Sequence, residues 1–223
     1  MRPYSTRREY QLSRALQPSA MSVDACRAVI DFPVKLTGLR ILDAGAGESD
    51  CVAWLSLQGA YAYAIDPRYR DLQQLKHDMD MTIDSKLRKV ASRYGADHAQ
   101  LLQSSIERTR ANFRRDTKIN IKHYAAALIG CLPFIDEVFD FIYSIDCIGK
   151  GIDEDESLFR QSVQDTLRVL RHGGELQIYP FLGHGSSTNA KNQRKVLSHI
   201  PHSVEEIGGS EFDHPFRVRI RKP

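Results

Sequence analysis

Long apolar runs are absent from this chain. None of its 223 residues lies in a stretch approaching the roughly 20 consecutive apolar residues that a membrane-spanning helix requires. The first residues, MRPYSTRREYQLSRAL, also lack the short apolar core of a secretory signal peptide. We therefore expect a cytoplasmic protein without a membrane partner.

Cysteine is scarce, and the cysteines that occur are far apart. Cys26, Cys51, Cys131 and Cys147 form no C-x-x-C pair, so their spacing predicts neither a zinc site nor a compact disulfide framework. We expect all four to be small core residues.

Patterns of metal ligands are lacking as well. His77, His98 and His123 do not have a ligand spacing. The acidic run DEDE at 153–156 could suggest a metal, but acids in this pattern are typical of a helix start. We predict no metal site.

Acidic residues are few between Lys86 and Lys122. This segment has ten lysines and arginines against three acids, a net charge of +7, whereas the whole chain carries +3. Two interpretations stay open: a patch that faces phosphate groups, and the solvated face of helices. The scarcity of interleaved aromatic residues favours the helical face.

The composition that remains is that of a folded globular protein, with 42% hydrophobic and 26% charged residues. A chain of 223 residues suits one large domain with appendages. We predict an N-terminal arm or lid over residues 1–35, with a short helix capped by Ser22, and a main domain over residues 36–223.

Strand and helix patterns alternate along the main domain. The expected strands lie at 39–47, 61–67, 118–126, 138–149, 175–181, 202–207 and 216–221. The expected helices lie at 49–59, on both sides of Gly95 within 69–116, at 153–172 before Gly173 and Gly174, and at 189–199. Such alternation predicts an α/β fold: a doubly wound, mostly parallel, Rossmann-like sheet with helices on both faces.

The stretch ILDAGAGESD at 41–50 reads as a buried strand that ends in a glycine turn. Gly45 and Gly47 allow a positive φ and a close approach of a ligand to the backbone. Asp43, Glu48 and Asp50 flank the turn, so we expect a ligand with a cationic centre rather than a pyrophosphate. The fingerprint G-x-G-x-x-G fails because Asp50 replaces its third glycine.

An aspartate closes the second expected strand. Asp66 lies 23 residues after Asp43, close to the interval at which an acid reaches ribose hydroxyls in nucleoside-binding βαβ units. An Asp before a Pro is by itself more typical of a turn at a strand end. Combined with the glycine turn, the spacing favours a ribose-binding residue.

Four segments together resemble the successive motifs of class I S-adenosylmethionine-dependent methyltransferases. They are ILDAGAGESD, AIDPRY, CLPFIDEVFDFIYSI and LRVLRHGGELQIYPF, within residues 39–181. The late pair of strands matches the reversed seventh strand of this family, so the resemblance covers about four fifths of the chain and is closest to small bacterial members of largely unassigned substrate. It implies seven strands and S-adenosyl-L-methionine as cofactor.

The resemblance also implies which residues bind the cofactor. Asp43, Gly45, Ala46 and Gly47 would surround its methionine part, Asp66 its ribose, and Pro67 and Tyr69 its adenine, with Ala126 and Ser144 also at the site. Many family members have an acid after the third strand for the adenine amino group. This chain has alanine at 125–127, so another group must replace that contact.

The acceptor normally meets the cofactor at the end of the fourth strand, which here reads YSIDCIGK. The [DNS]PP[YF] signature of methyltransferases that act on planar or amide nitrogens is absent, which disfavours nucleobase methylation of that type. Asp146 is a candidate to orient an amine or hydroxyl, and His184 a candidate to accept a proton. Each has a structural alternative: Asp146 could cap a neighbouring backbone group, and His184 could be a solvated loop histidine.

The resulting hypothesis is a methyltransferase that acts on a small-molecule or polypeptide acceptor by in-line displacement. RNA methylation through the basic 86–122 segment is an alternative. A non-catalytic S-adenosylmethionine-binding module is another. A dehydrogenase is a more distant alternative.

Overall fold

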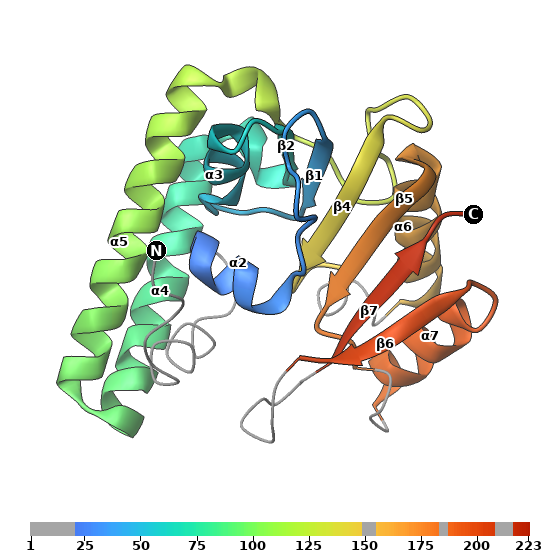
Figure 1. The fold of residues 1–223 in the computed structure, drawn as a ribbon. Coiled ribbons are helices and arrows are strands. Elements are labelled where there is room, and N and C mark those ends of the chain that lie inside the picture. The colour runs from blue at the N-terminus through green and yellow to red at the C-terminus, as the bar shows by residue number, and fades with distance from the viewer. Residues whose placement is uncertain (1–20, 149–154, 183–186, 208–215) are drawn as a thin grey trace.

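One sheet of seven strands organises the protein (Figure 1). The computed structural model describes residues 21–148, 155–182, 187–207 and 216–223. The strands are β1 (Arg40–Ala44), β2 (Tyr61–Ile65), β3 (Tyr124–Ala125), β4 (Phe139–Ile145), β5 (Leu170–Tyr179), β6 (His202–Glu206) and β7 (Phe216–Arg221). Their order is β3-β2-β1-β4-β5-β7-β6. The pairs of β7 with β5 and with β6 are antiparallel and the other four pairs are parallel, so the predicted mostly parallel sheet with a reversed seventh strand is confirmed.

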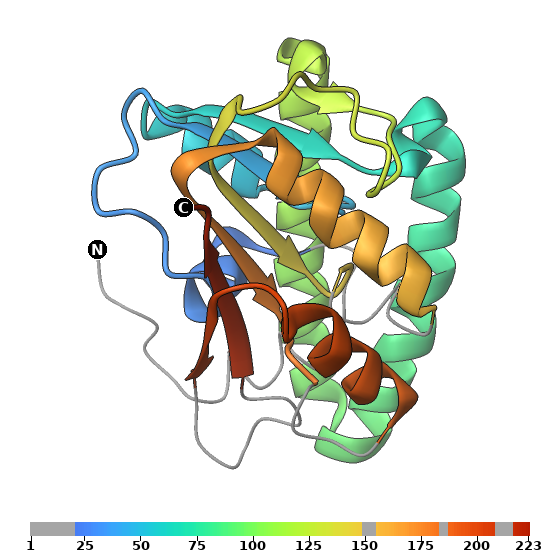
Figure 2. The same ribbon diagram turned by 90° about the vertical axis from the view of Figure 1, so that its right-hand side faces the viewer.

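Helices cover both faces of this sheet (Figure 2). They are α2 (Val23–Val29), α3 (Cys51–Leu57), α4 (Leu72–Tyr94), α5 (Ala96–Ile119), α6 (Glu156–Val169) and α7 (Thr188–Leu197), with short 3-10 turns η1 (Pro67–Arg70) and η2 (Ile121–His123). Helices α2 to α5 pack on one face and α6 and α7 on the other. Consecutive residues of β1 point to opposite faces of the sheet. Ile41 packs in the core under α2 to α5, and Leu42 packs in the core under α6 and α7. Burial on both faces explains why β1 and β4 are hydrophobic nearly throughout.

Helices α4 and α5 form a long antiparallel hairpin. The predicted break at Gly95 is confirmed: Gly95 has a φ of 95° and stands between the two helices. A positive φ of this kind is easy only for glycine. The hairpin packs its own apolar side chains together, including Ile83, Val90, Leu102 and Ile106.

The boundary between α6 and β5 differs from the prediction. The helix ends at Val169 rather than at Gly173 and Gly174, and Leu170 is already extended and paired with Phe139. The two glycines lie inside β5, where the register with β4 shifts. A Cβ on Gly174 would come within 2.9 Å of the carbonyl oxygen of Arg171, so the glycines serve a strand irregularity and not a helix end.

The cysteines also differ from the prediction. Cys26 of α2 and Cys51, the first residue of α3, form a disulfide across 25 residues of sequence. Both are buried, but they are covalently joined and are not separate core residues. Cys131 is exposed, and Cys147 is half-buried. Disulfides are unusual in proteins kept in a reducing cytosol, and the cytoplasmic location stays a prediction.

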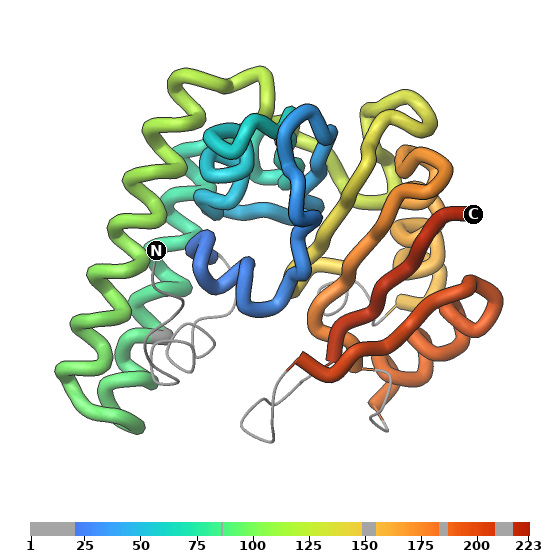
Figure 3. The backbone as a smooth tube through the Cα atoms, viewed as in Figure 1, coloured from blue at the N-terminus to red at the C-terminus, as the bar shows by residue number. Residues whose placement is uncertain are grey.

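Helix α2 is part of the main core. Ser22 caps it as predicted, accepting a hydrogen bond from the Ala25 nitrogen at 3.3 Å. After α2 the chain crosses the front of the sheet and rises to the start of β1 (Figure 3). In this connecting segment, Phe32 packs edge-on against Trp54 of α3, with ring centroids 5.5 Å apart. The arm residues before position 21 lie outside the described part of the chain.

In the described residues, no helix is long and apolar enough to cross a membrane.

Candidate functional site

The candidate site lies where β1, β2 and β4 end. The strand order reverses at β1, with β2 on one side and β4 on the other. In open α/β sheets, ligands bind at the carboxyl edge beside such a reversal. The segments that follow β1, β2 and β4 begin with Gly45, Asp66 and Asp146, three residues that the sequence predicts to be functional.

The glycine turn has the backbone geometry that the sequence predicts. Gly45 has a φ of 87° and Gly47 a φ of 56°. The nitrogens of Gly45 and Ala46 both donate to the carbonyl oxygen of Ile65, at 2.9 and 3.0 Å, which fastens the turn to the end of β2. A Cβ on Gly45 would collide with Cys147, so the loop after β4 lies directly against the turn.

Asp66 is tied to the same turn. It is 3% exposed, and its Oδ2 accepts a hydrogen bond from the Gly47 nitrogen at 3.2 Å. Arg68 donates to Oδ1 from its backbone nitrogen at 2.9 Å and from Nε at 2.8 Å, and to Oδ2 from Nη2 at 2.8 Å. The structure therefore brings the predicted ribose-binding carboxylate and the glycine turn together, with Arg68 on the carboxylate.

The acids that follow the turn are already paired within the protein. Glu48 forms an ion pair with Arg110 of α5, and both side chains are buried. Asp50 accepts hydrogen bonds from the Val23 nitrogen and from the Asn112 amide, each at 2.9 Å. Burial raises the pKa of both carboxyls, and these partners oppose the rise. The expected attraction of a cation therefore does not extend to Glu48, whose charge is compensated.

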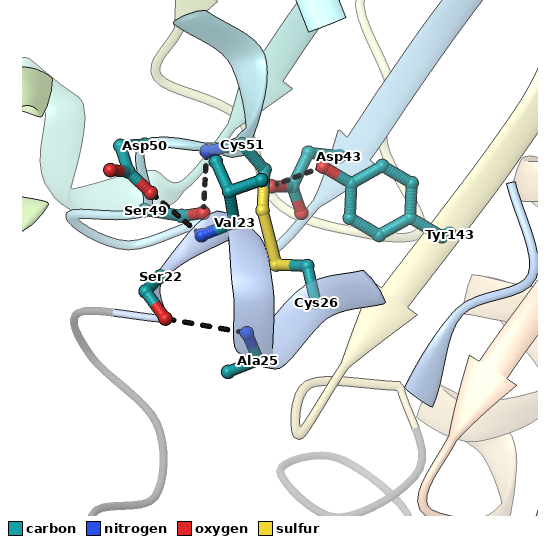
Figure 4. The surroundings of a disulfide bond; sticks show 9 residues. All are labelled: Ser22, Val23, Ala25, Cys26, Asp43, Ser49, Asp50, Cys51 and Tyr143. Atoms are coloured by element: carbon teal, nitrogen blue, oxygen red, sulfur yellow. Dashed lines mark hydrogen bonds between the residues drawn. A yellow bond between two sulfur atoms is a disulfide. The ribbon is translucent and has the colours of Figure 1, made fainter. Parts of the chain in front are cut away.

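Asp43 is different, because no cationic side chain in the described part of the chain pairs with it. It is 4% exposed, and Tyr143 of β4 donates a hydrogen bond to its Oδ2 at 2.9 Å. Burial raises the pKa of Asp43 to about 7, the tyrosine hydrogen bond opposes this rise, and the charge of Asp66 adds to it. Figure 4 shows this pair beside the disulfide of Cys26 and Cys51.

Two further predicted residues meet at one pocket. Pro67 and Ala126 line a pocket of about 530 Å³ at the ends of β2 and β3. Its remaining lining comes from Arg68, Arg70, Asp71, Gln74, Asp78, Ala127 and Leu128. The pocket adjoins Asp66 in sequence and through Arg68, which both lines the pocket and binds Asp66.

Tyr69 does not line this pocket. Its ring stacks on Phe113 of α5 with centroids 5.9 Å apart, and its hydroxyl donates to the Gly47 carbonyl oxygen at 2.6 Å. The side chain therefore braces the glycine turn from the core side. Burial raises the pKa of this phenol well above its usual range, so it stays a donor.

The segment after β4 contains the remaining predicted residues. Ser144 is fully buried and donates to the Ala44 carbonyl oxygen at 2.9 Å, while its oxygen accepts from the Ile148 nitrogen at 3.1 Å. Ser144 thus ties the ends of β1 and β4 together. Asp146 follows with a positive φ of 55°, and its nitrogen donates to the Tyr179 carbonyl oxygen at 2.7 Å. His184 lies outside the described residues.

One cation of the basic segment is withdrawn from the surface. Arg110 is buried in ion pairs with Glu48 and with Asp80, the latter at 2.6 Å. The other cations lie near the end of α4, on the second half of α5 and, in the case of Lys122, on η2. Because the helices are antiparallel, Lys89 and Arg115 are offset by about 20 Å along the hairpin at 1.5 Å per residue.

No group of three or more His, Cys, Asp or Glu side chains that could hold a metal ion occurs in the described part of the chain.

Sequence reasoning missed Arg68, Arg110 and Tyr143 as parts of this site. Arg68 is the only one with a local signal, since it follows Asp66 by two residues. Arg110 lies 62 residues from Glu48, and Tyr143 lies 100 residues from Asp43. Contacts at such separations depend on the topology and have no local pattern.

Comparison with known proteins gives distant likenesses only. No protein-family model matches the chain, and no curated protein matches it in sequence. Similar solved structures include a SAM-dependent methyltransferase from Aquifex aeolicus, at 14% identity and a TM-score of 0.46, covering 97% of each chain. A TehB-like SAM-dependent methyltransferase from Corynebacterium glutamicum has 16% identity and a TM-score of 0.48, covering 96% of this chain and 88% of the other. The N-methyltransferase NodS from Bradyrhizobium japonicum has 15% identity and a TM-score of 0.47, covering 84% and 87%. Likenesses of this size do not identify the acceptor.

Proposed function

We propose that the protein is an S-adenosylmethionine-dependent methyltransferase whose cofactor lies across the ends of β1, β2 and β3. The observation that carries the proposal is the hydrogen bond from the Gly47 nitrogen to Asp66, which joins the glycine turn to the buried acid of the next strand. A nucleoside that bears an amino acid needs the glycine turn and the acid side by side. The carboxylate accepts hydrogen bonds from the ribose hydroxyls, and the glycine turn lets the amino-acid part of the ligand approach the protein backbone closely.

Each predicted cofactor residue then has a distinct role. Asp43 binds the ammonium group. Asp66 accepts hydrogen bonds from the ribose hydroxyls once these displace the Arg68 guanidinium. Pro67 and Ala126 border the base in the 530 Å³ pocket. Tyr69 and Ser144 do not contact the cofactor in this proposal. Tyr69 holds the glycine turn in place, and Ser144 holds the end of β4.

The cofactor would supply a methyl group on a positively charged sulfur, which leaves as the neutral thioether when the methyl group is transferred. The protein contributes alignment of the acceptor and exclusion of water, which together account for much of the rate of such displacements. The segment after β4 faces the acceptor, where Asp146 orients an amine or hydroxyl. His184 remains the predicted proton acceptor if the nucleophile must lose a proton.

The acceptor is a small molecule or a polypeptide side chain. RNA has less support, because Arg110 of the basic segment is buried in an ion pair with Glu48. RNA would become the favoured acceptor if RNA binding showed a steep salt dependence and were lost on reversing the charges of Arg114 and Arg115. Residues 36–223 form the catalytic domain in this proposal, and the disulfide that holds α2 on α3 argues against a lid role for that helix.

Calorimetry with S-adenosylhomocysteine tests the cofactor site. We expect binding by the unmodified protein and at least tenfold weaker binding by Asp66→Asn, because a buried amide leaves donors unmatched. Asp84→Asn, an exposed position on α4, is the control and should bind normally. Absence of binding by the unmodified protein, or preference for NADH, would refute the proposal.

Turnover separates an enzyme from a binding module. A cell extract incubated with the protein and isotopically labelled S-adenosylmethionine should yield a product that has gained one labelled methyl group. Binding without any labelled product in extracts and candidate acceptors would favour the non-catalytic module.

A further inference from the structure

Asp43 and Tyr143 occupy facing positions on neighbouring strands. They are register partners in the parallel pair of β1 and β4, and both strands end at the candidate site. Tyr143 is fully buried, and its hydroxyl donates to Oδ2 of Asp43 at 2.9 Å. The hydrogen bond uses one carboxylate oxygen and leaves the other to a ligand.

Packing fixes the direction of the tyrosine hydroxyl. The ring of Phe32 meets Tyr143 edge-on with centroids 5.2 Å apart, and Phe141 lies on the same face at 6.3 Å. Phe32 follows α2, which the disulfide of Cys26 and Cys51 holds against α3. A buried ring confined in this way has few other rotamers, so its hydroxyl stays on Asp43.

The titratable groups around Asp43 come from several elements. Besides burial, Tyr143 of β4 and Asp66 at the end of β2 shift the pKa of Asp43 itself. Burial and, in addition, the charge of Asp43 raise the pKa of Tyr69 of η1, Tyr124 of β3 and Cys147 after β4. The cysteines of the adjacent disulfide do not titrate. Among these described groups, only the Tyr143 hydroxyl donates a hydrogen bond to the Asp43 carboxylate.

We propose that Tyr143 is a positioning residue that keeps Asp43 ionised and directs its second oxygen at the ammonium group of the cofactor. This inference rests on the proposed function. Its consequence is that the affinity for the amino-acid part of the cofactor depends on pH, while the affinity for the nucleoside part does not.

The sign of this dependence follows from the chemistry. The ammonium group binds the carboxylate and not the neutral acid, so affinity falls as pH drops through the pKa of Asp43, which is about 7 in the free protein. Removal of the tyrosine hydroxyl removes a hydrogen bond to the charged form, which raises that pKa further. The loss of affinity then begins at a higher pH.

Titration calorimetry between about pH 5.5 and 8.5 tests the proposal with S-adenosylhomocysteine and adenosine as probes. We expect Tyr143→Phe to move the pH midpoint of S-adenosylhomocysteine affinity upward by on the order of one unit and to weaken binding at pH 7 about fivefold. Adenosine, which lacks the amino acid, should bind both proteins equally at every pH.

Tyr124→Phe is the matched control. It removes another buried phenol hydroxyl, one that donates to Asp116 at 2.5 Å, and should leave the midpoint unchanged. An unchanged midpoint in Tyr143→Phe would overturn the proposal. If that variant does not fold, Asp43→Asn should abolish the pH dependence, and its persistence would overturn the proposal equally. Failure of the unmodified protein to bind either probe would instead refute the proposed function.

Discussion

Arg68 holds both carboxylate oxygens of Asp66, with Nε 2.8 Å from Oδ1 and Nη2 2.8 Å from Oδ2. The backbone nitrogens of Arg68 and Gly47 occupy one further acceptor position on each oxygen. A carboxylate has about four such positions, so all are filled. A ribose that binds Asp66 must therefore displace the Arg68 guanidinium.

Replacement of Arg68 by Met should strengthen nucleoside binding. The competing ion pair is partly exposed, so its removal is worth roughly 1 kcal/mol or about fivefold in affinity for adenosine. Calorimetry measures this change. Arg70→Met removes the same charge from an exposed residue lining the same pocket and should leave affinity within twofold. Weaker binding by Arg68→Met would show that Arg68 contacts the ligand.

Replacement of Gly45 by Ala should destabilise the protein and prevent cofactor binding. The backbone at Gly45 has a φ of 87°, which is strained for a residue with a side chain. The new Cβ would also collide with Cys147. We expect a loss of about 3 kcal/mol in the free energy of unfolding, measured by urea denaturation. Gly38→Ala is the control, since Gly38 has a φ of 81° with nothing within 4 Å. Equal losses in the two variants would contradict the close contact of the two loops.

The buried pair of Glu48 and Arg110 should be costly to break. Glu48→Gln leaves the guanidinium without its buried partner, and we expect a loss of about 3 to 5 kcal/mol in unfolding free energy. The pair of Glu156 and Arg160 on α6 is more exposed and screened by solvent, so Glu156→Gln should cost much less. A double variant, Glu48→Leu with Arg110→Met, should recover part of the loss. Equal costs at the two sites would argue against burial of the first pair.

Loss of the disulfide should lower stability by about 3 kcal/mol, because the bond closes a loop between residues 25 positions apart. The variant Cys26→Ala with Cys51→Ala should show this loss in urea denaturation, and dithiothreitol should reproduce it only in the unmodified protein. Cys131→Ala, at an exposed cysteine, is the control. Two reactive thiols at positions 26 and 51 in the unreduced protein would contradict the bond.

Features with a local cause could be predicted from the sequence. Gly95 separates α4 from α5 because only glycine easily adopts its φ, and Ser22 caps α2 through its own side chain. The strand β4 is recognisable because burial on both faces makes it hydrophobic nearly throughout. Gly45 and Gly47 mark the turn for the same reason as Gly95 marks the hairpin.

Features that depend on distant partners could not be predicted. The paired glycines at 173 and 174 have the signature of a helix end, but the chain is already a strand at Leu170 because it pairs with Phe139. The charge of Glu48 points to a cationic ligand until Arg110 is brought beside it by the hairpin. The bond between Cys26 and Cys51 likewise depends on where α2 folds back.

The chain has a single tryptophan, and its position makes it a built-in optical reporter. Trp54 lies on α3, edge-on to Phe32, with the guanidinium of Arg27 over its ring at 5.4 Å. Both neighbours belong to α2 or the segment just after it. Intrinsic fluorescence therefore follows the docking of this one helix, and a red shift of the emission would show its release even while the sheet remains intact.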